Sequence, residues 1–162
     1  MSEPAHPDTL PPIGLLTELD PGVRQILAQA GRFETLPVET RLITQGSSTR
    51  TLSVLLSGKA SAYCHANGDY VHVGDIKPGE TIGEMNMLDP QRASADVTVT
   101  EKAQVWIIEA EQFQAIVHQD PATAYTVIEW LARELCRRLR RNSDHMLRLA
   151  EERRSHMRDV DY

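Results

Sequence analysis

The stretch from Pro78 to Ala95 holds the residue types best suited to binding a small ligand. Its two glycines, Gly79 and Gly83, allow the backbone to approach a bound molecule closely. Glu84 supplies a carboxylate that accepts hydrogen bonds from paired hydroxyl groups, such as those of a ribose. Arg92 supplies a planar fork of donors that suits a phosphate. The segment therefore indicates a site for a sugar phosphate.

Small residues follow Arg92 directly. Ala93 and Ser94 bring small side chains and backbone N–H groups to the same anion. The alternative interpretation is that Glu84 and Arg92 simply form an ion pair with each other on a surface turn. Spacing alone leaves both interpretations open.

The elements around this stretch change character along the chain. Residues 13–31 have helical spacing, with Asp20 as N-cap, Pro21 at the first helical position and Gly31 as a stop signal. Short apolar runs then alternate with turn residues, which is typical of a β-barrel or sandwich. Asn67-Gly68 predicts a type I′ hairpin. The expected strands are Arg41–Thr44, Leu52–Leu56, Lys59–Cys64, Tyr70–Ile76, Ala95–Val99 and Gln104–Ile108.

Helical periodicity returns after Ile108. We expect a short helix over Ala110–His118 and a long one that opens at Asp120-Pro121 and runs to Asp159. The long helix carries a narrow apolar stripe, with Asn142 in its seam and a spacing nearer an 11-residue repeat than a strict heptad. Such a stripe predicts pairing with a second copy; the alternative is packing on the chain's own body. Its apolar members are Ile128, Leu131, Leu135, Leu139, Met146 and Leu149.

The order of these features resembles the cyclic nucleotide-binding domain family. The resemblance covers roughly residues 13–141 and rests on the Ser57-Gly58-Lys59 turn and on the segment from Gly83-Glu84-Met85 to Arg92, with a weaker match at Leu131-Ala132-Arg133. It implies a mainly β fold, an antiparallel, jelly-roll-like β-roll with flanking helices and a long C-terminal helix. Residues 1–12 are then a flexible arm, 13–141 the nucleotide-binding domain, and 142–162 a helical extension for dimerisation or partner docking.

The same resemblance implies a role for each ligand-binding candidate. Glu84 would bind the ribose 2′-hydroxyl, while the backbone at Gly83, next to Met85, would line the pocket. Arg92 would pair with the cyclic phosphate, and N–H groups near Ala93 and Ser94 would complete the cradle. Arg138 falls at a position that closes over the base, where its guanidinium can stack on a purine.

The segment also departs from the family pattern. The gap between Gly83 and Arg92 is one residue shorter than in many members, and an alternative alignment places Ala93 at the arginine position. Alanine after Arg92 favours cAMP by resemblance, whereas Ser94 takes that place under the shifted alignment and would allow cGMP. Asp96 stands where threonine is common. A carboxylate there weakens anion binding through like charge unless it faces away.

Composition bounds the remaining possibilities. The chain has 162 residues and 41% hydrophobic content, enough for one globular domain. Residues 1–128 hold 8 Lys and Arg against 16 Asp and Glu, whereas residues 129–162 hold 9 Arg against 7 acidic residues. An acidic body argues against general nucleic-acid binding, and the arginine cluster suits an acidic partner. About 20 residues follow Arg141, too few for a helix-turn-helix module, so no DNA binding is expected.

Two cysteines are too few for a disulfide framework, which favours a reducing compartment. The sequence has no apolar run of 18 residues and no secretory signal, so we expect a cytoplasmic protein without membrane contact. We expect no enzyme, no metal and no cofactor, because no nucleophile elbow, Walker loop or histidine cluster occurs. Cys64 and the histidines would permit a haem sensor of the same fold, although no motif supports one.

The expected function is a stand-alone receptor for a cyclic nucleotide, with cAMP favoured over cGMP. It would form a homodimer and signal by moving its C-terminal helix and binding a partner protein. Two alternatives stay open: a nucleotide-independent interaction module, and a binder of another nucleotide such as a cyclic dinucleotide.

Overall fold

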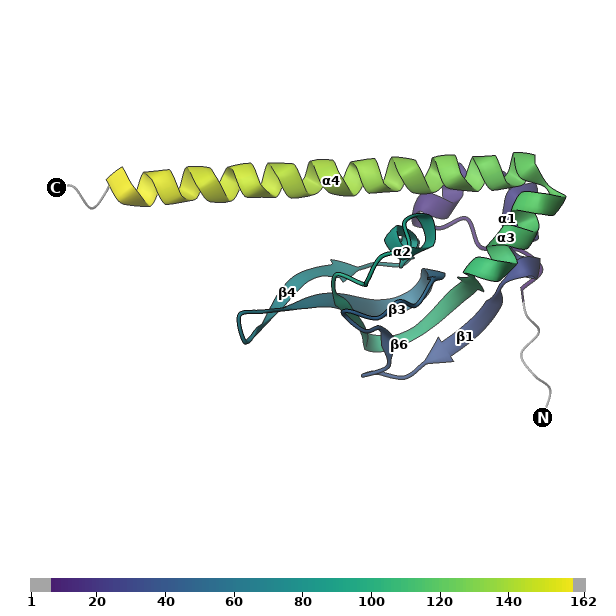
Figure 1. The fold of residues 1–162 in the computed structure, drawn as a ribbon, viewed down its shortest axis with the longest axis horizontal. Coiled ribbons are helices and arrows are strands. Elements are labelled where there is room, and N and C mark those ends of the chain that lie inside the picture. Colours follow the sequence, from purple (N-terminus) through teal and green to yellow (C-terminus); the bar gives the residue numbers. More distant parts are fainter. Residues whose placement is uncertain (1–6, 159–162) are drawn as a thin grey trace. The chain divides into compact units, whose positions relative to one another are not determined.

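The computed structural model describes residues 7–158 as a mainly β fold with helices at its ends (Figure 1). This confirms the expected antiparallel β-roll with flanking helices and a long C-terminal helix. In chain order the elements are η1 (Gly14–Glu18), α1 (Pro21–Ala30), β1 (Arg32–Leu36), β2 (Arg41–Ile43), β3 (Thr51–Ala66), β4 (Asp69–Ile76), β5 (Thr81–Ile82), α2 (Glu84–Leu88), β6 (Asp96–Glu109), α3 (Ala110–Gln119) and α4 (Pro121–Arg158).

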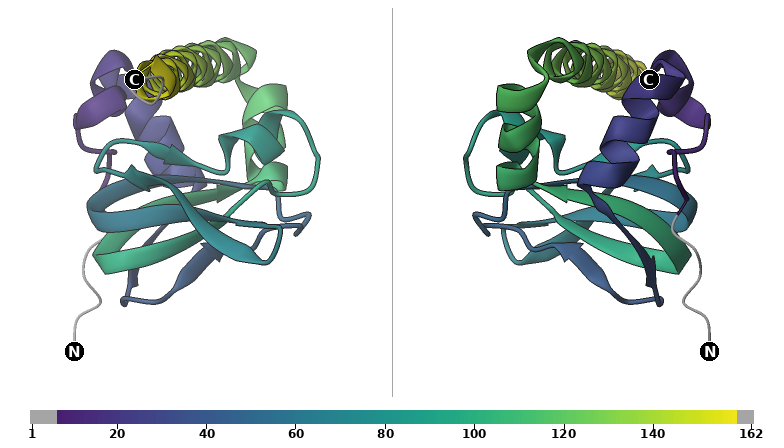
Figure 2. Two further views of the ribbon diagram at one scale, coloured as in Figure 1. Left: turned by 90° about the vertical axis from the view of Figure 1, so that its left-hand side faces the viewer. Right: turned by 90° about the vertical axis from the view of Figure 1, so that its right-hand side faces the viewer.

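Two long antiparallel strands, β3 and β6, form the centre of the sheet. They pair from Thr51 opposite Glu109 to Tyr63 opposite Asp96. The strand order is β1-β6-β3-β4, with β2 added to β6 and β5 added to β3. Figure 2 shows these strands curving into the roll. Every other strand is therefore positioned by one of these two.

The two long strands are longer than the sequence patterns predicted. The expected strands Leu52–Leu56 and Lys59–Cys64 are parts of β3. The expected strand Gln104–Ile108 is part of β6, and so is Ala95–Val99 except for Ala95, since β6 begins at Asp96. Gly58 was expected in a turn between strands, but the chain continues through it with φ of +81° and a shifted register on both sides. An irregularity of this kind bends a strand without ending it.

The local signals for α1 and for the hairpin are confirmed. Asp20 accepts a hydrogen bond from the Gly22 N–H at 2.8 Å, Pro21 opens the helix, and the Gly31 N–H donates to the Leu27 carbonyl. Asn67 and Gly68 both have positive φ between β3 and β4, as a type I′ turn requires. Strands β1 and β5 were not expected; they contain only five and two residues.

Alternate side chains of β3 and β6 fill the core between the layers. Aliphatic residues from both strands make up most of this cluster, which contains Leu55, Ala60, Ile76, Ile82, Val97, Val99, Ala103, Val105 and Ile107. Side chains alternate across a strand, yet the opposite face of these strands is also buried in part, since Leu52, Val54, Trp106 and Ile108 are each 0% exposed. Helix α1 leads into β1 and α3 follows β6, so both lie at the same end of the roll (Figure 1).

The expected flexible arm over residues 1–12 needs a correction for its second half. Leu10 is fully buried, its N–H donates to the Arg24 carbonyl, and its own carbonyl accepts from the Arg24 guanidinium at 3.1 Å. A segment with a buried leucine and a reciprocal pair of hydrogen bonds is anchored to α1. Residues 1–6 lie outside the described part of the chain.

The chain divides into two compact units, residues 1–127 and 128–162. The first contains the sheet, the shorter helices and the beginning of α4; the second is the rest of α4. The sequence placed a boundary after residue 141, which stays a prediction. Among the described residues, no helix is both long and apolar enough to cross a membrane.

Replacing Gly58 by alanine is expected to destabilise the roll strongly. A Cβ at this position would lie well inside 3 Å of the Lys102 carbonyl oxygen on the facing strand. Gly68→Ala is the matched control, because Gly68 has a similar φ of +88° and no atom within 4 Å of its added Cβ. The control should lose about 1–2 kcal/mol from backbone strain alone. Thermal melts that show equal losses for both variants would contradict the close β3–β6 contact.

Candidate functional site

The Gly83-Glu84 segment is positioned by β5, a two-residue strand paired with β3. Ser53 lies opposite Ile82 and Val54 opposite Thr81, so the chain reaches Gly83 directly from the centre of the sheet. Gly83 has φ of +83°, and a Cβ there would collide with the Thr51 carbonyl oxygen. Glycine is therefore required where the backbone turns into α2.

Glu84 is buried at the first position of α2, with 2% of its surface exposed. The neighbouring Met85 points outward and is 55% exposed. The alternative of a surface ion pair between Glu84 and Arg92 requires an exposed Glu84, and the structure buries it. A buried carboxylate at the beginning of a short helix is well placed to accept hydrogen bonds from a ligand.

Arg92 lies on the exposed loop between α2 and β6. Its Nη1 donates a hydrogen bond to the Gly46 carbonyl oxygen at 3.0 Å. A guanidinium has five N–H donors in a fixed plane, so one bond to a carbonyl leaves the rest of the fork for an anion. Arg92 is thus tied by one edge to the loop that joins β2 to β3.

Ala93 and Ser94 differ in what they offer. The Ala93 N–H donates to the Ser47 carbonyl and the Ala93 carbonyl accepts from the Gly46 N–H, both at 2.8 Å. The Ala93 N–H is therefore occupied in this structure. Ser94 is exposed, and its carbonyl accepts from the Cys64 thiol at 3.2 Å. Roles for both residues at a phosphate stay predictions.

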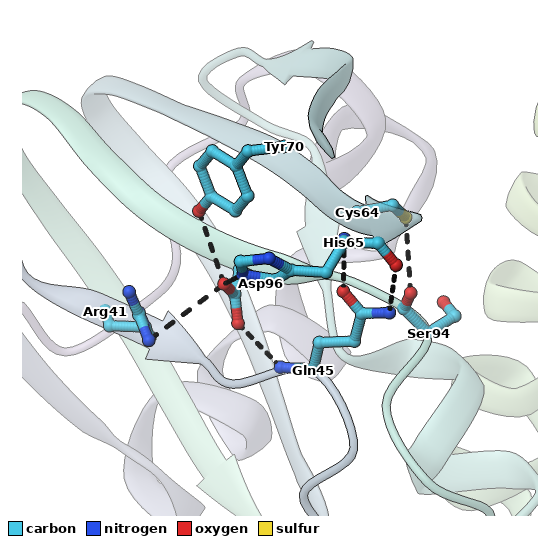
Figure 3. A network of polar contacts seen from close by, with 7 residues as sticks. All are labelled: Arg41, Gln45, Cys64, His65, Tyr70, Ser94 and Asp96. Carbon is cyan, nitrogen blue, oxygen red and sulfur yellow. Dashed lines mark hydrogen bonds and ion pairs between the residues drawn. The ribbon is translucent and has the colours of Figure 1, made fainter. Parts of the chain in front are cut away.

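Asp96 is the most elaborately partnered residue beside this loop (Figure 3). Its carboxylate is buried and accepts from the Gln45 N–H at 2.7 Å and from the Tyr70 hydroxyl at 3.3 Å. His65 Nε2 lies 3.4 Å away and Arg41 Nη1 4.0 Å away. The Gln45 hydrogen bond, aided by Arg41 and the other donors, holds the pKa of Asp96 below its usual value despite burial. The carboxylate thus faces this group of donors.

Asn86 is a positioning residue that the sequence analysis missed. It is 8% exposed, and its side-chain amide donates to the carbonyls of Gln91 at 3.1 Å and Thr49 at 3.4 Å. It therefore ties α2 to the loop that carries Arg92 and to the segment before β3. The sequence signal that could have revealed it is a polar side-chain amide between two methionines, Met85 and Met87, in a short apolar segment.

Arg138 lies in the second unit, on α4. Its Nε is 3.5 Å from Glu134 Oε1, and Arg141 donates to the same oxygen at 3.1 Å. Glu134 is only 1% exposed, so these arginines balance a buried negative charge. The predicted stacking of Arg138 on a base stays a prediction. Among the described residues no group of three or more His, Cys, Asp or Glu side chains is arranged to hold a metal.

A comparison with protein families decides the class of this site. The profile of the cyclic nucleotide-binding domain matches residues 33–120. The chain belongs to the cyclic nucleotide-binding domain family. The match contains the sheet from β1 onward, α2, the Arg92 loop and α3. The expectation drawn from the sequence is therefore confirmed at the level of the family, whose members serve regulation and signal transduction.

Individual relatives agree with this assignment. The cyclic AMP receptor protein of Thermus thermophilus is 29% identical over 92 residues, which are 56% of this chain and 43% of the receptor. The Pycsar effector protein XpPycTIR of Xanthomonas perforans is 30% identical over 114 residues, 69% of this chain and 36% of the effector. The chain thus spans less than half the length of either relative.

A solved structure shows the same fold. The crystal structure of a cyclic nucleotide-binding domain from Methylobacillus flagellatus superposes with a TM-score of 0.76. It shares 20% identity and covers 80% of this chain, which in turn covers 73% of that structure. The fold is therefore conserved at low sequence identity, and the ligand must be argued from the residues of the site.

Replacing Asn86 by alanine is expected to loosen the Arg92 loop. Two carbonyl groups lose their amide donors, which should lower the free energy of unfolding by about 1–3 kcal/mol. Met85→Ala is the matched control, since Met85 is the exposed neighbour on the same short helix. Hydrogen exchange at residues 89–93 should accelerate in Asn86→Ala alone. Equal acceleration in both variants would show that α2 as a whole, rather than Asn86, holds the loop.

Proposed function

We propose that this chain is a receptor for a cyclic mononucleotide, with cAMP preferred over cGMP, and that it acts without catalysis. The observation that carries the proposal is the arrangement of Glu84 and Arg92. A buried carboxylate stands at the beginning of α2, and an exposed guanidinium stands at the other end of the same segment. A ribose phosphate offers hydroxyl donors for the first and an anion for the second.

The preference for cAMP rests on Ala93. In this family, alanine after the phosphate-binding arginine favours cAMP, and the sequence places Ala93 there when Arg92 is the phosphate ligand. The structure supports Arg92 in that role, because it is exposed, whereas Ala93 is buried. The relationship to a protein named as a cyclic AMP receptor is consistent with this choice.

The signal is proposed to leave through α4. A ligand shifts a conformational equilibrium only by its different affinities for the two states, so α4 must alter its position or order when nucleotide binds. Coupling of this kind amounts to about 1–3 kcal/mol in other proteins. The arginines of α4 then supply a surface for an acidic partner protein in the cytoplasm.

The same helix is proposed to join two copies of the chain. Leu139, Met146 and Leu149 are exposed on α4 and recur at spacings of seven and three residues. Exposed leucine and methionine at such spacing are typical of one side of a coiled coil, and Asn142 lies among them. An asparagine in such a seam favours a defined register.

Calorimetric titration of cAMP and cGMP tests the ligand. Wild type should bind cAMP more tightly than cGMP, and Arg92→Ala should lose about tenfold or more in affinity, because a charged pair loses one member. Arg32→Ala is the matched control: it removes one exposed positive charge from β1, which lies outside the site.

The outcomes separate the alternatives. Equal losses in both arginine variants would mean that Arg92 contributes only general charge. Absence of binding by wild type would overturn the proposal and favour a nucleotide-independent interaction module. Binding of a cyclic dinucleotide with no response to cAMP or cGMP would replace the ligand while keeping the family.

Leu139→Glu is expected to convert the dimer to a monomer. A buried charge in a coiled-coil seam is unfavourable, whereas the same charge outside the seam remains hydrated. Leu147→Glu is the matched control, because Leu147 is 63% exposed and Leu139 68%, but Leu147 lies off the stripe. Sedimentation equilibrium should show dissociation for Leu139→Glu alone. A monomeric wild type, or dissociation of both variants, would contradict pairing along this stripe.

A further inference from the structure

The loop between β2 and β3 touches both the buried Asp96 and the exposed Arg92. Gln45 donates its backbone N–H to Asp96 at 2.7 Å. The next residue, Gly46, accepts from Arg92 Nη1 at 3.0 Å through its carbonyl. The N–H group that Asp96 accepts from and the carbonyl group that Arg92 donates to therefore belong to consecutive residues, Gln45 and Gly46.

Gln45 is held on its other side by β3. Its side-chain Oε1 accepts from the His65 N–H at 2.7 Å, and its Nε2 lies 3.4 Å from the His65 carbonyl oxygen. Figure 3 shows Gln45 between Asp96 and the end of β3. The backbone of Gln45 is thus held by β6 and its side chain by β3.

The far side of the loop is fixed by Ala93. The Gly46 N–H donates to the Ala93 carbonyl and the Ala93 N–H to the Ser47 carbonyl, each at 2.8 Å. This reciprocal pair holds the loop beside the residue that follows Arg92. With Gln45 anchored on one side and Ala93 on the other, the Gly46 carbonyl has a defined position.

The environment of Asp96 suits a permanently charged anchor. Three elements direct donors or positive charge at its carboxylate: Arg41 from β2, His65 from β3 and Tyr70 from β4. A buried carboxylate with several hydrogen-bond donors stays ionised, and an ionised acceptor makes a stronger bond to a backbone N–H. The bond to Gln45 is accordingly short.

We propose that Asp96 and Gln45 are positioning residues for the anion site: they fix the Gly46 carbonyl, which orients the guanidinium of Arg92 toward the ligand. The binding of a nucleotide phosphate by Arg92 rests on the proposed function. The effect of Asp96 on the position of the loop does not depend on that function. The predicted effect on affinity is opposite to that of like-charge repulsion, because removal of the Asp96 side-chain acceptor should weaken anion binding.

Two substitutions at Asp96 distinguish positioning from charge. Asp96→Asn keeps an oxygen that can accept from the Gln45 N–H, and its affinity for cAMP should stay within about twofold of wild type. Asp96→Ala removes the acceptor and should lose about tenfold in affinity, the lower end of the loss seen when a metal ligand loses its outer-shell partner. If both variants bind more tightly than wild type, the carboxylate acts by repelling the ligand and the proposal is overturned.

A double-mutant cycle tests whether the effect passes through Arg92. Added to Arg92→Ala, Asp96→Ala should cause no further loss, because the group that it orients is absent. An undiminished tenfold loss in that background would overturn the proposal. Gln45→Ala gives a second entry to the cycle if Asp96→Ala folds poorly, since it keeps the Asp96 bond and removes only the side-chain link to His65.

A ligand-free measurement separates this inference from the proposed function. In Asp96→Ala, hydrogen exchange at the Gly46 amide should accelerate and the NMR signal of Arg92 Nε–Hε should sharpen toward that of a mobile side chain. Asp96→Asn should leave both unchanged. Unchanged signals in Asp96→Ala would overturn the positioning role even if cAMP binds. Altered signals in a protein that binds no cyclic nucleotide would uphold the link to Arg92 while the proposed function fails.

Discussion

The pairing of β3 with β6 is the constraint on which the site depends. β5 pairs only with β3 and leads into Gly83 and α2, while β2 pairs only with β6 and leads into the Gln45–Ser48 loop. Any separation of the long strands would move the buried Glu84 and the partner loop of Arg92 independently. The close approach of Gly58 to Lys102, which leaves no room for a side chain, marks how tightly the two strands are joined. The candidate site consequently depends on strand pairing as well as on the sequence between Gly79 and Ala95.

Sequence patterns were most informative where a residue type imposes a local conformation. Asp20-Pro21 fixed the beginning of α1, and Asn67-Gly68 fixed the hairpin, because caps and type I′ turns require those residues. Gly58 led to a wrong prediction for the same reason: positive φ is common to turns and to bulges, and local sequence does not distinguish them.

Strands β1 and β5 are short and gain their stability from their neighbours β6 and β3, so neither has a sequence pattern of its own. Leu10 looked like part of a proline-rich arm because its partner, Arg24, lies on α1.

The site was predictable in its residue types and less so in its connections. Glu84 and Arg92 were identified from their chemistry and from a family resemblance that the comparison with family profiles confirmed. The hydrogen bond that holds Arg92 joins residues 46 positions apart in the chain, and no spacing rule reveals it.

Asp96 illustrates the same difficulty, since a carboxylate at this position suggests repulsion of an anion. Only the fold shows that Gln45, Tyr70, His65 and Arg41 surround its carboxylate. A buried charge of this kind contributes through the geometry it imposes on its donors.

The charge of the molecule bears on which anions it can hold. Residues 1–128 are strongly acidic, and Arg92 is the single Lys or Arg between Pro78 and Ala95, a stretch that also contains Glu80, Glu84 and Asp89. Screening at physiological ionic strength confines the exposed charges to an effective range of about 8 Å. The single cation of this stretch matches the one negative charge of a cyclic mononucleotide, the ligand proposed above. Arg41, 4.0 Å from Asp96, is a further guanidinium beside the loop. A polyanion such as duplex DNA would meet repulsion from the acidic residues of the body beyond the first contact.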